Sequence, residues 1–288
     1  DHDGRPIWQR DLPGIYSRFG PGTSPALFND LVVFTHEYWG SGPEGGKHES
    51  SWIAVDCKTG ETRWTTKRNN AEISYSTPCV YSPDGREPQL IFTSWAHGVT
   101  GVEPQTGRVI WEAASALPAR VVSSPVIAGD LLIGTCGKGG AGLQLAAVRP
   151  GSADKPEQAA LVYKLTGKSA PYVPTPLAKD GLLFTFHDAG DVSCLRMETG
   201  QTLWCQKPGG RFYGSPVWVN GLLYCINRAG DVVVVKAAPT YELLAVNSLG
   251  EKSQATPAVS GGRIYLRTYS HLISIGGPAR PVGRTSIP

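Results

Sequence analysis

The feature that most constrains the fold of this chain is a short element that recurs six times. Each copy is a serine or threonine, then a proline, then a mostly apolar stretch. The prolines are Pro25, Pro78, Pro125, Pro176, Pro216 and Pro257. Successive copies are separated by 53, 47, 51, 40 and 41 residues. A period of about 40–50 residues built from short strands is typical of a β-propeller, in which each repeat forms one blade.

Each repeat divides into four predicted strands separated by tight turns. In the fifth repeat a strand at 215–219 precedes Asn220-Gly221, a second strand at 222–227, a turn at 228–231 and two more strands. Asn-Gly and Asp-Gly supply the positive φ that two-residue hairpins require. No segment shows the 3.6-residue periodicity of a helix. The sequence therefore predicts an all-β β-propeller of six four-stranded antiparallel blades. We expect a single domain over residues 1–276 and an extended tail at 277–288.

A second recurring element is a Thr-Gly turn with a tryptophan four residues after the glycine, as in 57–64, 104–111 and 197–204. The stretch AVDCKTGETRW (54–64) resembles the A-x-D-x-x-T-G-x-x-x-W docking motif of the repeats named for pyrroloquinoline quinone. The chain is thus similar to propellers of that superfamily, in the style of the BamB outer-membrane assembly lipoproteins. The resemblance implies that the turn contacts the neighbouring blade and that the tryptophan fills the gap between blades, as a large flat side chain can.

The two ends of the repeat array suggest how the ring closes. GRPIW (4–8) matches the end of the motif without three strands before it, whereas the last repeat, from Pro257 to residue 275, lacks a fourth strand. We expect residues 4–8 to pair in the last blade, which removes an exposed strand edge. Propellers of the BamB type have eight blades, so six is a departure. The alternative is a fragment of a seven- or eight-bladed propeller, in which residues 4–8 end a blade of their own.

Charge and composition argue against several classes of function. The chain has 27 Lys and Arg against 24 Asp and Glu, a net charge of +3, and no basic run that would indicate a nucleic-acid partner. No apolar run approaches the roughly 18 residues of a membrane span, and no signal peptide opens the chain. The six cysteines lack metal-like spacing and are expected to be buried thiols. Cys194 and Cys205 are expected opposite each other across a turn, where a disulfide is possible.

Function is expected on one face of the propeller. The links between strands 2 and 3 and between consecutive blades lie on the same face, and here they carry histidine, aromatic and basic residues. Such residues on the loops of a rigid scaffold are typical of recognition surfaces. The predicted binding residues are Tyr75, Arg120, Tyr172, Arg211, Tyr213, Lys252, His97, His187 and Arg228. The alternative is that the tyrosines only plug the channel and that the histidines are solvated.

No catalytic constellation is apparent in the sequence. The chain lacks the adjacent cysteines of the quinone-dependent dehydrogenases of the superfamily, and no Glu/Asn/Asp calcium set stands out. It also lacks a G-x-S-x-G elbow, an H-E-x-x-H motif and a phosphate loop. We therefore expect no cofactor, no metal site and no enzymatic activity.

The expected function is that of a non-catalytic scaffold that binds a protein segment or an extended polymer. It would serve cell-envelope assembly or act as the sensor part of a larger protein. The resemblance implies a periplasmic, outer-membrane-associated or extracellular location, and we expect a monomer. The alternative is a small-molecule or carbohydrate-binding propeller with enzymatic activity.

Overall fold

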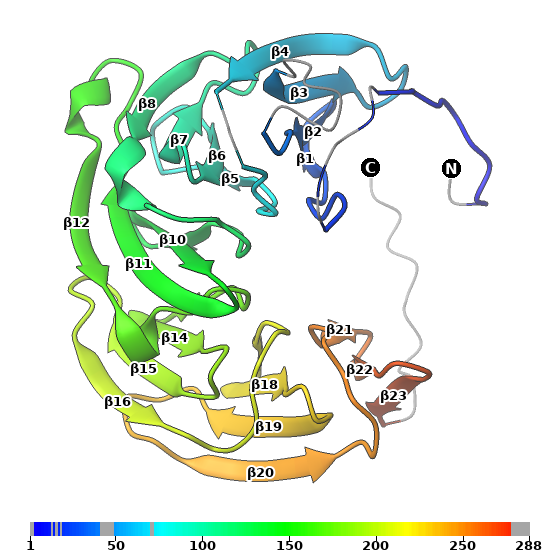
Figure 1. Cartoon of the computed structure of the whole chain (residues 1–288), viewed down its shortest axis with the longest axis vertical. Coiled ribbons are helices and arrows are strands. Elements are labelled where there is room, and N and C mark those ends of the chain that lie inside the picture. The colour runs from blue at the N-terminus through cyan, green and yellow to red at the C-terminus, as the bar shows by residue number, and fades with distance from the viewer. Residues whose placement is uncertain are drawn as a thin grey trace.

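The computed structural model describes residues 3–12, 14, 17, 19–40, 49–69 and 72–277. Within these ranges the chain forms strands and three short 3-10 helices, η1 (Ala114–Ala116), η2 (Pro156–Gln158) and η3 (Gly167–Ser169). The strands build six antiparallel sheets that follow one another around a common centre (Figure 1). The predicted all-β propeller of antiparallel blades is confirmed.

The sheets are numbered here as blades in chain order. Blade 1 consists of β1 (Ala26–Phe28), β2 (Leu31–His36), β3 (Ser50–Asp56) and β4 (Thr62–Arg68). Blade 2 consists of β5 (Cys79–Tyr81), β6 (Gln89–Ser94), β7 (Gly98–Val102) and β8 (Val109–Ala113). Blade 3 consists of β9 (Val126–Ala128), β10 (Leu131–Lys138), β11 (Ala141–Arg149) and β12 (Ala160–Leu165).

The second half of the chain forms the other three blades. Blade 4 consists of β13 (Leu177–Lys179), β14 (Leu182–Phe186), β15 (Val192–Arg196) and β16 (Thr202–Gln206). Blade 5 consists of β17 (Val217–Val219), β18 (Leu222–Ile226), β19 (Asp231–Lys236) and β20 (Leu243–Ser248). Blade 6 has three strands, β21 (Ala258–Ser260), β22 (Arg263–Arg267) and β23 (Leu272–Gly276).

The hydrophobic core is divided into clusters between consecutive blades. The cluster between blades 1 and 2 includes Trp52 and Phe92, whose rings stack with centroids 3.9 Å apart. Four further clusters join blades 2 and 3, 3 and 4, 4 and 5, and 5 and 6. Because blades 2 to 5 bury both faces against their neighbours, their inner strands are apolar on both faces.

The predicted wedge between blades is present and has a common geometry. In each four-stranded blade, strand 4 carries one extra residue where it pairs with strand 3, which is a β-bulge. The residue of strand 4 directly after this bulge occupies the wedge position. The residues in that position are Trp64, Trp111, Tyr163, Trp204 and Ala245. Trp64 Nε1 donates to Pro104 O at 2.8 Å, Tyr163 Oη to Met197 O at 2.8 Å, and Trp204 Nε1 to Ala238 O at 3.0 Å. Each acceptor lies in the turn between strands 3 and 4 of the next blade.

The expected pairing of residues 4–8 with the last blade is not found. These residues form no strand, and in the described part of the chain β23 pairs only with β22. Trp8 instead docks on blade 1, where its Nε1 donates to Cys57 O at 3.0 Å, and Arg10 Nη1 donates to Gly60 O at 3.0 Å. This contact needs only the indole, one N–H and a facing glycine, so it forms without backbone pairing. The alternative of a longer propeller stays a prediction.

The expected opposition of Cys194 and Cys205 is also corrected. Cys194 lies opposite Trp204, and Cys205 lies opposite Ser193. With this one-residue offset, the two side chains point to opposite faces of the sheet, so no disulfide can join them. All six cysteines are free thiols. Burial raises the pKa of Cys79 and Cys194 to about 12, as expected for inert core thiols.

Candidate recognition face

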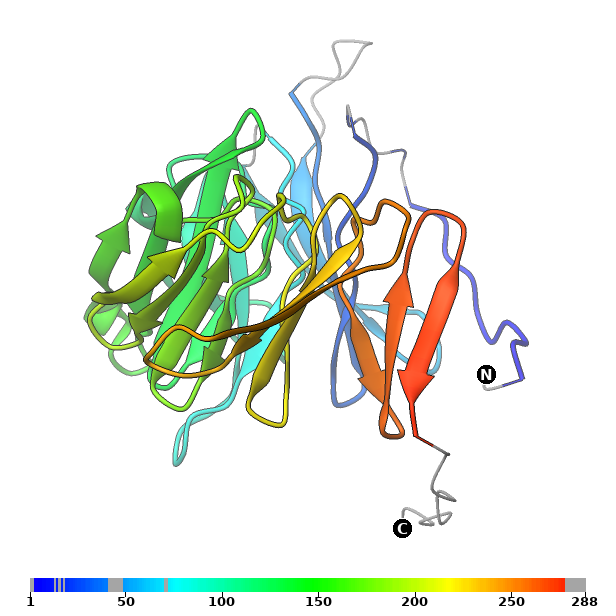
Figure 2. The same ribbon diagram turned by 90° about the horizontal axis from the view of Figure 1, so that it is seen from below.

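Antiparallel topology brings two kinds of loop to the same face of the molecule. The links between strands 2 and 3 meet the links that enter each blade, and Figure 2 shows both along one side. Isolated β-bridges join them directly: Arg120 pairs with Gly137 and Phe212 pairs with Asn227. We call these two sets of loops the recognition face, and in blades 3 and 5 the bridges fix the entering link to the rest of the same blade.

The most elaborate cluster on this face surrounds Arg120. Its Nε and Nη2 donate to Glu72 Oε2 at 3.3 and 3.1 Å. Its guanidinium carbon lies 4.7 Å from the ring centroid of Trp39 and 5.6 Å from that of Phe19. Burial alone would lower the pKa of Arg120, but Tyr172 and Glu72 raise it above the ordinary value. The arginine is therefore a permanent cation held between a carboxylate and two aromatic rings.

Two predicted tyrosines adjoin this cluster and depend on glycines for their positions. Tyr75 Oη lies 3.2 Å from Ser17 Oγ, and a Cβ on Gly22 would come within 2.7 Å of the Tyr75 ring. Tyr172 contributes to the raised pKa of Arg120, and its ring lies over Gly137, where a Cβ would be 2.5 Å from Tyr172 Cγ. The structure therefore brings together Tyr75, Arg120 and Tyr172, and their part in binding stays a prediction.

A second group lies over blades 4 and 5. The Arg228 guanidinium carbon is 4.5 Å from the Tyr213 ring centroid, and Arg228 N donates to Arg211 O at 2.7 Å. Arg211 Nε donates to the backbone oxygen of Asp188 at 3.0 Å. The buried Asp188 carboxylate in turn accepts hydrogen bonds from Tyr172 N at 2.6 Å and from Val173 N at 3.1 Å. Asp188 thus connects the second group to the Arg120 cluster.

His187 and Lys252 have different surroundings. His187 Nδ1 accepts a hydrogen bond from Ala189 N at 2.9 Å, as Asn227 Oδ1 does from Ala229 N in the next blade. The buried histidine therefore organises its turn. Lys252 is exposed, and its backbone oxygen accepts from Tyr269 N at 3.2 Å. Lys252 lies beside a hollow lined by residues of blade 6 and its entering link.

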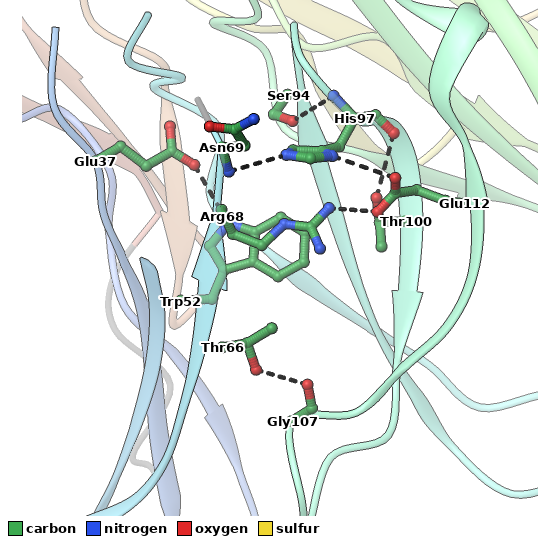
Figure 3. Close-up of polar contacts among 10 residues, drawn as sticks. All are labelled: Glu37, Trp52, Thr66, Arg68, Asn69, Ser94, His97, Thr100, Gly107 and Glu112. Atoms are coloured by element: carbon green, nitrogen blue, oxygen red, sulfur yellow. Dashed lines mark hydrogen bonds and ion pairs between the residues drawn. The ribbon is translucent and has the colours of Figure 1, made fainter. Parts of the chain in front are cut away.

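His97 belongs to a clamp between blades 1 and 2 (Figure 3). Its Nδ1 lies 3.2 Å from Glu112 Oε1, and its Nε2 accepts from Asn69 N at 3.3 Å. Glu112 also pairs with Arg68, whose guanidinium carbon lies 4.2 Å from the Trp52 ring centroid. The structure gives His97 these contacts within the protein, and its part in binding stays a prediction.

Sequence reasoning missed Phe19, Trp39, Glu72 and Asp188. Each belongs to a loop that meets another blade only in three dimensions. The one available signal was their position, since Glu72 and Asp188 lie in loops that already carried predicted binding residues.

Two features are absent from the residues that the structure describes, a metal-ligand cluster and a membrane-spanning helix. No three or more of their His, Cys, Asp and Glu residues are grouped so that they could hold a metal ion. Within the same ranges, no helix has the length and apolar character needed to cross a membrane.

Comparisons with known proteins agree with this architecture. A family model described as outer membrane protein assembly factor BamB matches residues 1–204 and residues 155–270. BamB from Moraxella catarrhalis is similar in structure, with a TM-score of 0.47 and 15% identity over 88% of this chain and 82% of that one. No curated protein matches in sequence.

A europium-containing methanol dehydrogenase is also similar, with a TM-score of 0.57 and 12% identity over 86% of this chain. The match covers 62% of the dehydrogenase, and at this identity the likeness shows the fold alone. The family model, in contrast, spans well over half of the chain and confirms the resemblance seen in the Thr-Gly repeats. The protein therefore belongs to the BamB family of propellers built from repeats named for pyrroloquinoline quinone.

Proposed function

We propose that the protein is a non-catalytic scaffold that binds an extended segment of a partner protein on the recognition face. The observation that carries the proposal is the Arg120 cluster. One guanidinium, a carboxylate from Glu72 and the rings of Phe19 and Trp39 meet at loops from different blades. Arginine and large aromatic residues are the side chains most enriched at the energetic centres of protein interfaces.

Exposure supports the same function. Phe19 is 63% exposed, whereas Trp39 and Tyr75 are half-buried and Tyr172 is buried. An exposed aromatic ring beside a fixed cation offers apolar area and a charged hydrogen-bond donor together. The face would therefore suit a peptide with both apolar and polar side chains.

The family description suggests the setting of this binding. It names an outer membrane protein assembly factor, so we propose that this protein acts in the cell envelope, outside the cytoplasm, and that it does so as a monomer. A sensor role within a larger protein uses the same face and the same chemistry.

A phage-displayed library of 12-residue peptides tests the proposal. We expect the intact chain to enrich peptides that Arg120→Ala no longer retains. Arg149→Ala is the matched control, because Arg149 ends β11 on the opposite face and is exposed. Equal enrichment by the Arg120→Ala protein, or none by either, would contradict the proposal. Arg120-dependent binding to a glycan array instead of peptides would favour the carbohydrate-binding alternative.

A further inference from the structure

A group of four cations, three of them exposed and Arg228 half-buried, lies beside the Arg120 cluster, on the loops of blades 4 and 5. We call it the basic arc, and it consists of Lys168, Lys207, Arg211 and Arg228. Lys168 Nζ and Lys207 Nζ each lie 3.9 Å from a different oxygen of Asp191. Their side chains are 74% and 61% exposed. At 3.9 Å neither ammonium is hydrogen-bonded to Asp191, so both keep donors that can face solvent.

Close backbone contacts fix the loops that carry these cations. A Cβ on Gly190 would lie 2.0 Å from Gly210 O, so the turn of blade 4 and the link to blade 5 touch directly. The link is then joined to the next turn by the hydrogen bond from Arg228 N to Arg211 O. Gly209 and Gly210 contribute no side chains that could cover the neighbouring cations.

The carboxylates of the same loops are largely buried or hydrogen-bonded within the protein. Asp188 is fully buried and accepts two backbone hydrogen bonds, and the Asp191 side chain is only 10% exposed. Asp231 accepts a hydrogen bond from Asn227 Nδ2 at 3.0 Å. The whole chain carries a net charge of only +3, so this positive surface is a local arrangement.

We infer that the basic arc is a subsite for acidic side chains of the extended protein segment that the recognition face binds. The inference rests on the proposed function and adds the chemistry of the partner. Two ammonium groups already arranged about one carboxylate can take up a second carboxylate from outside. Arg228, stacked on Tyr213, presents its donors beside an apolar ring, which suits a peptide in which acidic and apolar residues alternate.

The arc is continuous with the Arg120 cluster. Asp188 accepts from the backbone of Tyr172 on one side, and its own backbone oxygen accepts from Arg211 on the other. One extended segment can therefore contact both, with its apolar side chains near Phe19 and its carboxylates over the arc. Phosphate-bearing lipid would need the cations but not the aromatic cluster, and is the competing ligand in the test.

Fluorescence anisotropy of a labelled 12-residue peptide with alternating Glu and Tyr, added to the full chain, tests the inference. The probe for comparison is the same peptide with Gln in place of Glu. We expect the acidic peptide to bind at least tenfold more tightly at low salt, with most of the difference lost at high salt. We expect the double variant Lys168→Gln/Lys207→Gln to lose about three- to tenfold in affinity for it.

The matched control is Lys58→Gln/Lys155→Gln, which removes two exposed lysines from turns between strands 3 and 4, on the face opposite the arc, and should bind as the unchanged protein does. Equal binding of the acidic and amide peptides, or an arc variant that binds the acidic peptide normally, would overturn the inference. Arc-dependent binding to phosphatidylglycerol vesicles without binding of the acidic peptide would also overturn it.

The outcome separates this inference from the proposed function. If both peptides bind equally and Arg120→Ala weakens both, the recognition face binds peptides but the arc does not select acidic ones. If neither peptide binds and the phage library enriches nothing, both proposals fail.

Discussion

At the scale of single residues, the fold depends on pairs of one aromatic ring and one glycine. Gly60, Gly107 and Gly200 have φ values of 74°, 71° and 72°. A Cβ on them would lie 2.7, 2.5 and 2.7 Å from the rings of Trp8 and of the wedge residues Trp64 and Tyr163, in that order. The glycine is required twice, for its backbone conformation and for the ring that lies on it.

Two substitutions separate the contribution of the ring contact from that of the backbone conformation. Gly107→Ala should lower the free energy of unfolding by about 2–4 kcal/mol, because it adds a clash with Trp64 to backbone strain. Gly85→Ala is the control, since Gly85 has a φ of 67° but no atom within 4 Å of the added Cβ. It should cost about 1 kcal/mol. Urea unfolding measures both, and equal losses would show that the ring contact contributes nothing.

At the scale of elements, adjacent blades are joined by polar clamps as well as by core clusters. In the clamp of blades 1 and 2, Arg68 at the end of β4 is only 7% exposed and pairs with Glu112 on β8. Glu37, after β2, accepts from Trp52 Nε1 at 3.2 Å and from Ser74 N at 2.8 Å, which fastens the link entering blade 2. These bonds hold the loops of the recognition face at the rim of two blades.

Glu112→Gln should therefore destabilise the protein although Glu112 itself is partly exposed. The change leaves the buried guanidinium of Arg68 without its anionic partner, for an expected loss of about 1–2 kcal/mol in the free energy of unfolding. Glu103→Gln is the control, because its pair with Arg108 is exposed at both ends and should contribute below about 0.5 kcal/mol. Chemical denaturation of both variants measures the difference, and similar values would contradict a buried clamp.

At the scale of the whole molecule, acid should destabilise blade 6, at the end of the array, before the blades in the middle. Glu251 accepts hydrogen bonds from Ser270 and Thr268 of blade 6, which lower its pKa from 4.5 to about 2. Its folded pKa is lower than the unfolded one, so its stabilising contribution is present above about pH 4.5 and disappears as the pH falls towards 2.

Glu251→Gln should accordingly flatten the acid side of the stability profile. The unchanged protein should lose stability more steeply than the variant between about pH 4.5 and pH 2. Urea unfolding across that range measures the two slopes. Parallel profiles would show that Glu251 is not linked to folding in this way.

Much of the scaffold was predictable from the sequence, because it depends on contacts within one repeat. Asn29, Asp180 and Asn220 have φ values of 52°, 49° and 50°, as hairpin turns of this kind need. The Thr-Gly turns and their tryptophans likewise indicated the wedge between blades. Those signals alone indicated the all-β class, the blade period and the order of the strands.

Tertiary structure decided what depends on contacts between repeats. In blade 2, Trp111 Nε1 donates to Gln89 Oε1 of its own blade, and Gln89 Nε2 donates to Gly151 O of blade 3. Trp8 docks on blade 1 without pairing with β23, because the side-chain contact needs no backbone partner. Arg120 meets Glu72, Phe19 and Trp39 only because loops distant in the sequence converge at one rim. The sequence alone therefore determined the blades, since turn geometry and strand pattern are local. The composition of the recognition face required the folded chain, since its contacts are long-range.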